Sequence, residues 1–251
     1  MRRLARRLAA SSAGVALTEF ALSLPLVLLA GLGGMEVSNY VLANLRIAQI
    51  AQTVADNAGR YRQALDEGDV NEIMVGAKLM GQKIGLAANG RIILTDLEQR
   101  TNTDGAGGKG ATSAANPSGF RQWIRWQRCA GALNRASSFG VPRNAAGGAV
   151  TDIGAAPLPD HGAAQEGSTI DGMGPAGKQI AAAGGTAVMV VEIVYVYQPI
   201  VPLYSFGASE MRAVEAFAIR QRSDFSVYNA NNRTGSARSD CRLFSEAVPT
   251  G

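Results

Sequence analysis

Residues that could do catalytic or metal chemistry are few in this sequence. The single histidine, His161, lies in a stretch rich in Gly and Pro, and one histidine cannot build the usual multi-histidine metal sites. Asp160 and Asp171 could join it in a weak site, but a solvated loop histidine is the simpler interpretation. Residues 104–110, DGAGGKG, lack the spacing of a phosphate-binding loop.

No GxSxG nucleophile elbow and no HExxH zinc motif occurs in the chain. The sequence therefore predicts a protein that is not an enzyme, with no catalytic residue, no metal site and no cofactor.

Cysteine chemistry is limited to two residues, Cys129 and Cys241, which lie too far apart for a CxxC redox or zinc motif. In a translocated domain, two distant thiols would most simply form a disulfide. Loop-closure entropy would make such a bond worth about 4–5 kcal/mol. Two unrelated buried thiols are the alternative.

The net charge of +4 comes from the extreme N-terminus. Basic residues exceed acidic ones by four, and four arginines precede the first apolar run: Arg2, Arg3, Arg6 and Arg7. The rest of the chain is electrically balanced and carries no basic footprint, which excludes nucleic acid as a partner.

An apolar run extends from Val15 to Met35 and contains one charged residue, Glu19. As a helix it is long enough to cross the ~30 Å hydrocarbon layer of a membrane, and Pro25 is tolerated in such helices. The preceding arginines place the N-terminus in the cytoplasm and the chain beyond about residue 36 outside. A secretory signal peptide is the competing interpretation, but this run is longer than the usual apolar region and includes an acid.

Glu19 is the residue in this run that requires an explanation. A carboxylate at the centre of a membrane helix costs up to about 3 kcal/mol, and less near an interface. Such residues are functional candidates that need a partner. The simpler alternative is that Glu19 lies at headgroup level and complements the helix N-terminus.

Residues 14–20, GVALTEF, resemble the class III signal of type IV pilins and tight-adherence pseudopilins. The longer stretch GVALTEFALSLPLVLL is similar to the opening of TadE-like proteins. The resemblance implies that a prepilin peptidase cuts between Gly14 and Val15. It also implies that Glu19, followed by Phe20, pairs with the new α-amine of Val15 on a neighbouring subunit.

The resemblance further implies a minor pseudopilin, a structural and assembly component of a tight-adherence (Flp-type) pilus or secretion apparatus. Its partners would be the prepilin peptidase, other pilins or pseudopilins, the inner-membrane platform with its secretin and ATPase, and membrane lipid. The protein would sit in the bacterial inner membrane as a single-pass protein with a periplasmic C-terminal domain, or enter a surface filament. The alternative is an uncleaved, membrane-anchored periplasmic binding module, which would not need processing after Gly14.

Two helices are expected to position these residues. Apolar residues at 37, 41, 45 and 48 follow helical spacing, which predicts one helix from about 16 to 65 with its lower half in lipid and its upper half packed on a domain. A membrane helix followed by a separate helix is the alternative. A second helix is predicted over 69–88, with Asp69 as its N-cap.

Four strands are predicted at 91–97, 120–129, 186–198 and 211–219, although a helix is also compatible with the last. In the second strand, the favoured interpretation places Trp123 and Trp126 inward and Arg121, Arg125 and Arg128 outward, although two residues three apart face opposite sides of a regular strand. A basic-aromatic binding face is the alternative. A second, weaker resemblance to TadE-like proteins covers 194–203 and 218–222. The predicted fold is α+β and pilin-like, with the long helix packed on a small antiparallel sheet.

The expected domain organisation has three parts. Residues 1–14 form a basic cytoplasmic leader, 15–35 a transmembrane segment, and 36–251 an extracytoplasmic stalk helix and α+β domain. Two Gly-rich, polar inserts within the last part, 103–119 and 140–185, are predicted to be flexible.

Overall fold

The computed structural model describes the chain in seven stretches: 13–99, 122–142, 169–170, 172–175, 177–201, 210–233 and 235–248. The chain divides into two compact units. Unit 1 comprises Met1–Leu42 with Gln198–Ala208, and unit 2 comprises Ala43–Tyr197 with Ser209–Gly251. The leader arginines, the 103–119 insert, and the Asp160, His161 and Asp171 group lie outside the described residues.

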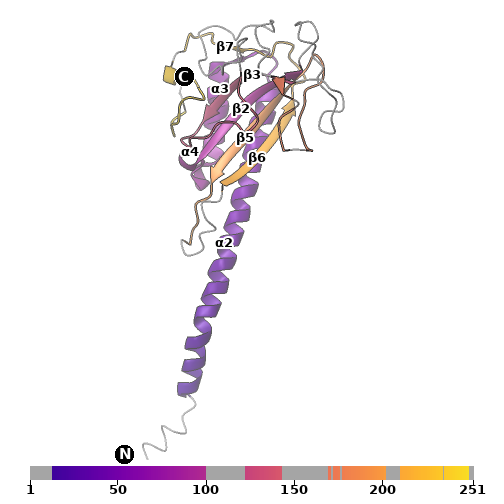
Figure 1. Cartoon of the computed structure of the whole chain (residues 1–251). Coiled ribbons are helices and arrows are strands. Elements are labelled where there is room, and N and C mark those ends of the chain that lie inside the picture. Colours follow the sequence, from indigo (N-terminus) through magenta and orange to yellow (C-terminus); the bar gives the residue numbers. More distant parts are fainter. Residues whose placement is uncertain are drawn as a thin grey trace, which may run out of the picture. The chain divides into compact units, whose positions relative to one another are not determined.

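Helix α2 runs from Ala13 to Arg60 and contains Pro25 (Figure 1). The predicted long helix is thus confirmed, although it ends five residues earlier than expected. Arg60 caps the last turn as a basic residue and pairs with Asp56 at 2.7 Å. In the segment that follows, Leu65–Asp66 forms strand β1, which pairs in parallel with β7 (Val227–Tyr228), so the chain is extended there instead of helical.

Unit 2 is built on a five-stranded antiparallel sheet with the order β4-β3-β2-β5-β6. All four predicted strands are present, as β2 (Gly90–Gln99), β3 (Gln122–Ala130), β5 (Ala187–Val196) and β6 (Glu210–Ala218). The fifth, β4 (Thr169–Ile170), is too short to leave a sequence pattern. The α+β prediction, a long N-terminal helix and a small antiparallel sheet, is confirmed.

The second predicted helix is broken into pieces: α3 (Glu67–Met80), a 3-10 turn at Gln82–Ile84, and α4 (Leu86–Asn89). Gly81 and Gly85 separate them, and Gly85 has a left-handed φ of 64°. The prediction of Asp69 as N-cap is wrong. Asp66 is the cap, and Asp69 closes the reciprocal side of a capping box by accepting from the Asp66 N–H at 2.9 Å.

Strand β3 differs from its prediction because of a β-bulge. The register shifts so that Trp126 pairs with Asp96 while Trp123 pairs with Glu98, which leaves Arg125 as the extra residue. The two tryptophans therefore face the same side of the sheet as Asp96 and Glu98, whereas simple alternation predicted opposite sides.

The arginines of β3 are also buried instead of facing outward. Arg125 pairs with Glu98 at 3.0 Å, and both side chains are about 4% exposed. Arg128 forms hydrogen bonds through Nε and Nη2 with the carboxylate of Glu67 at the start of α3. Each guanidinium also lies over its neighbouring tryptophan ring, so the arginines are inside because they have charged and aromatic partners there.

The two faces of the sheet are covered differently. On one face the Ala43–Arg60 part of α2 packs against the strands: an added Cβ at Gly59 would collide with Phe217, and Arg222 donates to the Ala58 carbonyl at 3.1 Å. On the other face, Leu97, Ile124, Val188 and Val190 form a core cluster with Met173 and Ala182.

Met173 and Ala182 are thus packed on the sheet, although they fall inside the 140–185 insert that was predicted to be flexible. Met173 and Ala182 supply the apolar contacts, and Met173 and Ile180 exchange backbone hydrogen bonds at 2.9 and 2.7 Å. Gln122 fixes the segment further, because its side chain bonds both the N–H and the carbonyl of Ala182. These contacts depend on partners distant in sequence, so local composition could not reveal them.

Candidate assembly surface on the N-terminal helix

The residues predicted for processing and assembly all lie on the first turns of α2. Gly14, Val15, Glu19 and Phe20 are exposed, and no atom lies within 4 Å of a Cβ added at Gly14. Val15 and Glu19 are four positions apart, so their side chains are neighbours on one face of the helix. The structure therefore brings the predicted cleavage point and the predicted assembly carboxylate onto one continuous surface.

The surface around Glu19 is almost entirely apolar. The most apolar stretch of α2 has a mean hydropathy of 2.0 with none of it buried, and by length and composition this helix can cross a membrane. Among the residues that the structure describes, Glu19 has no hydrogen-bond or ion-pair partner. The large exposed apolar side chains of this part are Val15, Leu17, Phe20, Leu22, Leu24, Leu26, Val27, Leu28, Leu29 and Leu32.

A helix that is apolar on all sides requires an apolar environment, either lipid or other helices. In such an environment an exposed carboxylate is costly unless a cation approaches it. The geometry of this surface is consistent with a carboxylate that receives its partner from another molecule.

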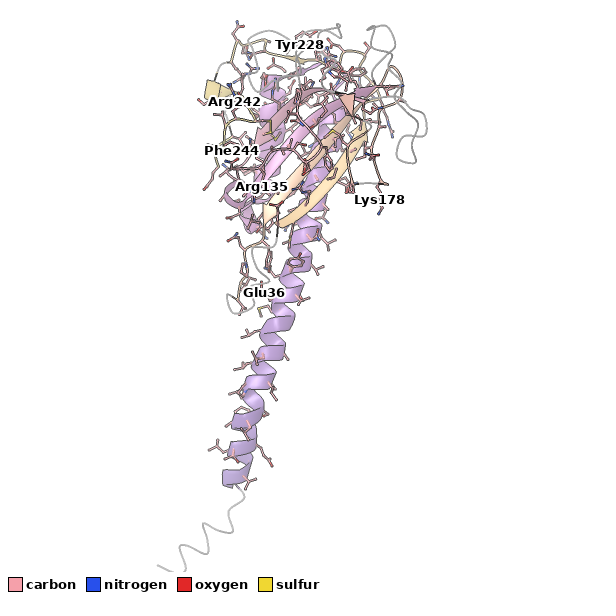
Figure 2. All side chains as sticks on the ribbon, viewed as in Figure 1. Glu36, Arg135, Lys178, Tyr228, Arg242 and Phe244 are labelled. Carbon is pink, nitrogen blue, oxygen red and sulfur yellow. A yellow bond between two sulfur atoms is a disulfide. The ribbon has the colours of Figure 1, made fainter. Side chains whose placement is uncertain are left out.

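Glu36 is a second acid on α2, and sequence reasoning assigned it no role. Its side chain lies on α2 (Figure 2) and is completely buried. Its Oε2 accepts hydrogen bonds from the backbone N–H groups of Ile200 and Val201 at 3.1 and 2.9 Å. All three residues belong to unit 1. Two signals could have found it: no other charged residue lies between Glu19 and Arg46, and the segment after the Tyr195–Tyr197 strand end is apolar and Pro-rich.

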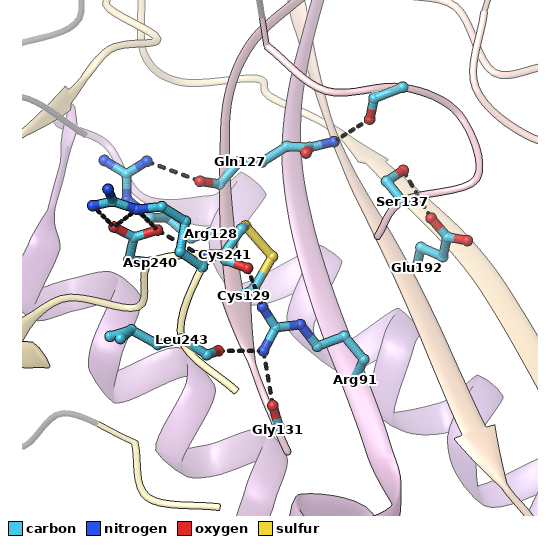
Figure 3. The surroundings of a disulfide bond; sticks show 12 residues. Arg91, Gln127, Arg128, Cys129, Gly131, Ser137, Glu192, Asp240, Cys241 and Leu243 are labelled. Carbon is cyan, nitrogen blue, oxygen red and sulfur yellow. Dashed lines mark hydrogen bonds and ion pairs between the residues drawn. A yellow bond between two sulfur atoms is a disulfide. The ribbon is translucent and has the colours of Figure 1, made fainter. Parts of the chain in front are cut away.

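In unit 2 the predicted cysteine pair is joined. Cys129 on β3 and Cys241 in the C-terminal tail form a disulfide with an S–S distance of 2.05 Å (Figure 3). The Cys129 N–H also donates to the Ser239 carbonyl at 2.8 Å. The tail is therefore fixed against β3 by a covalent bond and by the backbone.

Arg91 reinforces the attachment of this tail. From β2 its guanidinium donates to the carbonyls of Gly131, Leu243 and Cys241 at 2.8, 2.6 and 2.6 Å (Figure 3). Burial lowers the pKa of Arg91 to about 10, which leaves it charged at neutral pH. The face of Arg91 also stacks on Phe244, 4.5 Å from the ring centroid.

A pocket of about 160 Å³ lies beside the disulfide, with a lining that is more apolar than polar. Its walls come from β3, the segment after β3 and the tail. Its charged residues, Arg128, Arg135, Asp240 and Arg242, include the pair Asp240–Arg242 at 2.7 Å. The charged residues of this pocket pair with each other or with neighbouring protein groups. We therefore interpret the pocket as part of the packing around the disulfide and not as a ligand site.

Asp96 is the most perturbed acid of unit 2. Neither of its carboxylate oxygens has a hydrogen-bond partner among the described residues. Burial raises the pKa of Asp96 well above its ordinary value, and nearby Glu98 raises it further, while Arg222 and Arg125 act in the opposite direction. Within the described stretches, no group of three or more His, Cys, Asp or Glu residues could hold a metal ion.

Comparison with known proteins gives one result. The family model for TadE-like protein matches residues 14–56, which confirms the resemblance seen in the sequence over this part of the chain. Comparisons with curated proteins and with solved structures gave no match. The family match suggests a Tad pilus-associated structural component, and together with one apolar N-terminal helix it suggests a membrane-anchored protein.

Proposed function

We propose that this chain is a minor pseudopilin of a tight-adherence pilus or secretion apparatus, made as a precursor and cleaved between Gly14 and Val15. The observation that carries the proposal is the exposed, apolar first part of α2, with Glu19 one helical turn after Val15. This part of the chain lies within the TadE-like match.

Cleavage would change the charges at the start of α2. It removes the four leader arginines and creates a cationic α-amine on Val15. Glu19 of one subunit then accepts a hydrogen bond from that amine on the next, and each pairing removes one uncompensated charge from an apolar bundle. The pairing also fixes the axial position of one helix relative to its neighbour.

The proposed topology follows from charge. The leader arginines stay in the cytoplasm before processing, residues 15–35 cross the inner membrane, and the domain beyond lies in the periplasm. A prepilin peptidase, other pilins or pseudopilins and the inner-membrane platform are the proposed partners, with lipid surrounding α2 before assembly.

The test is intact-mass and N-terminal analysis of membrane-extracted protein from cells with and without the prepilin peptidase. A mature chain that begins at Val15 only when the peptidase is present is the expected result. An intact leader in both strains would contradict the proposal and favour a permanently anchored periplasmic binding module instead.

A second experiment tests the carboxylate. Glu19→Ala should insert in the membrane and be processed normally, yet fail to co-isolate with the other pseudopilins. Ser23→Ala is a matched control one turn along the helix, because the Ser23 hydroxyl donates only to the Phe20 carbonyl of its own helix. Normal assembly of Glu19→Ala would refute the pairing.

A further inference from the structure

The chain segment that leaves β5 lies against α2 within unit 1 and has an unusual backbone. Pro199 has no N–H group, and the N–H groups of Ile200 and Val201 both donate to Glu36 Oε2. The next residue in the sequence is Pro202, which also has no N–H. Four consecutive residues therefore offer no free backbone donor.

A segment without regular secondary structure can lie at the edge of the hydrocarbon layer only if its backbone N–H groups have hydrogen-bond acceptors within the protein. Water is scarce there, and an N–H group without an acceptor is strongly unfavourable in hydrocarbon. In this segment the carboxyl group of Glu36 accepts both remaining N–H groups. The same contact keeps Glu36 off the surface, because its side chain is completely buried.

The side chains around this contact present apolar surface. Ile200 is 59% exposed, and Met35, Val37, Val41 and Leu42 on α2 are between 49% and 63% exposed. The Ser38 hydroxyl is satisfied by the Gly34 carbonyl at 2.8 Å. Because Glu36 is hidden, no charged side chain of α2 reaches the surface of unit 1 after Glu19, so the apolar surface continues past residue 35, where the sequence predicted the membrane segment to end.

We propose that Pro199–Val201 is a second membrane contact, inserted at the boundary between lipid headgroups and acyl chains beside α2, with Glu36 as the clamp that makes insertion possible. The partner is the lipid bilayer, because the exposed apolar surface at this point is continuous with that of the membrane-spanning part of α2. The inference rests on the membrane anchorage in the proposed function but not on cleavage or filament assembly.

The experiment uses the full chain with single introduced cysteines, labelled with an environment-sensitive fluorophore. Selective labelling is feasible because both native cysteines are joined in the disulfide. Ile200→Cys is the test position, Leu26→Cys is the reference inside the span, and Leu79→Cys, on an exposed residue of α3 in unit 2, is the second reference. The labelled proteins are reconstituted in phosphatidylethanolamine–phosphatidylglycerol vesicles that contain nitroxide lipids, with the nitroxide near the headgroup or deep in the acyl chain.

The label at residue 200 should emit at shorter wavelength than the label at 79 and be quenched severalfold more strongly by shallow than by deep nitroxide. The label at 26 should prefer the deep quencher. Emission and quenching at 200 that equal those at 79 would overturn the inference while leaving anchorage intact. Failure of the label at 26 to reach lipid would instead contradict membrane anchorage itself.

Two variants separate the clamp from general damage to the fold. Glu36→Ala should shift the emission of the residue-200 label to the wavelength of a label in water and abolish its quenching by the headgroup nitroxide. Glu36→Gln keeps an acceptor oxygen, so its label should retain part of the short-wavelength emission and part of the quenching. The label at 26 should not respond to either change. If the label at residue 200 emits at short wavelength only at high protein-to-lipid ratio, a second copy of the chain covers this residue. That result would overturn the assignment to lipid.

Discussion

Helix α2 belongs to both units, and its two parts differ in the exposure of their apolar side chains. In unit 1 the large residues Leu22 and Leu26 are 77% and 69% exposed. In unit 2 the helix buries mostly small residues, among them Ala51, Ala55 and Ala58, together with Ile47 and Ile50. The part of α2 in unit 2 packs its apolar side chains on the sheet, whereas the part in unit 1 needs lipid or another molecule to cover its apolar side chains.

The units also treat acidic side chains differently. In unit 1, Glu19 is exposed without a partner among the described residues, whereas Glu36 is buried and accepts hydrogen bonds from two backbone N–H groups. In unit 2, Glu67 is completely buried between two arginines, Arg128 and Arg238. Glu67 thus finds its cationic partners within unit 2, whereas Glu19 of unit 1 has none among the described residues and is available to another molecule.

The largest effect is expected from opening the buried cluster of unit 2. Glu67→Ala leaves Arg128 and Arg238 without their shared carboxylate, and removing one partner of a buried ion pair costs about 3–5 kcal/mol. The free energy of unfolding of the detergent-solubilised protein, followed by tryptophan fluorescence, measures it.

Glu210→Ala is the matched control, because Glu210 also pairs with two arginines, Arg135 and Arg212, but all three side chains are between 32% and 49% exposed. Such surface pairs are worth at most about 1 kcal/mol. Equal losses from the two variants would show that the cluster around Glu67 is not a stability determinant of unit 2.

The next effect concerns the tail of unit 2. Cys241→Ser should lower the free energy of unfolding by about 2–4 kcal/mol, because the unfolded chain regains the freedom of a long loop. The double variant Cys129→Ser, Cys241→Ser should lose no more than the single variant, since one bond is removed in both. A reductant should abolish the difference between wild type and variant, and its persistence under reduction would argue that the loss has another cause.

A third test compares two glycines on the same helix. Gly59→Ala would drive a Cβ into Phe217, and overpacking of this kind costs about 1–3 kcal/mol. Gly34→Ala has no atom within 4 Å of its new Cβ, so the variant should keep or slightly gain stability by up to about 1 kcal/mol from helix propensity. Thermal unfolding in detergent distinguishes them, and similar losses at both sites would mean that unit 1 is as tightly packed as unit 2.

The sequence predicted the helices and strands better than the contacts between them. The uninterrupted apolar pattern of α2 and the β-branched run AVMVVEIVYV of β5 are local signals, and both elements formed where expected. The N-cap at Asp66 was missed because Asp69, three residues later, offers the same side chain and serves the reciprocal half of the capping box. Local patterns identify such a box more easily than they decide which acid begins the helix.

What the sequence could not predict depends on contacts between distant segments. The bulge at Arg125 is a property of the pairing of β3 with β2, and the burial of Arg128 requires Glu67 from α3. Likewise, Glu36 and Ile200 meet only because the segment after β5 returns to α2. For the candidate site, the spacing from Gly14 to Glu19 could be read directly, but the role of Glu36 could not.

The last prediction concerns how stability changes with pH, and it comes from Asp96, the buried acid of unit 2 without a hydrogen-bond partner among the described residues. Burial raises the pKa of Asp96, so the folded state keeps this proton to higher pH than the unfolded state does. Its contribution to stability is therefore complete below the unfolded pKa, near 3.9, and is lost as pH rises through the folded pKa, with a limiting slope of about 1.4 kcal/mol per pH unit. Asp96→Asn cannot ionise, so its stability relative to wild type should grow as pH increases from about 4. Stability of the two proteins measured against pH tests this, and a difference that stays constant with pH would mean that Asp96 is ionised in the folded protein.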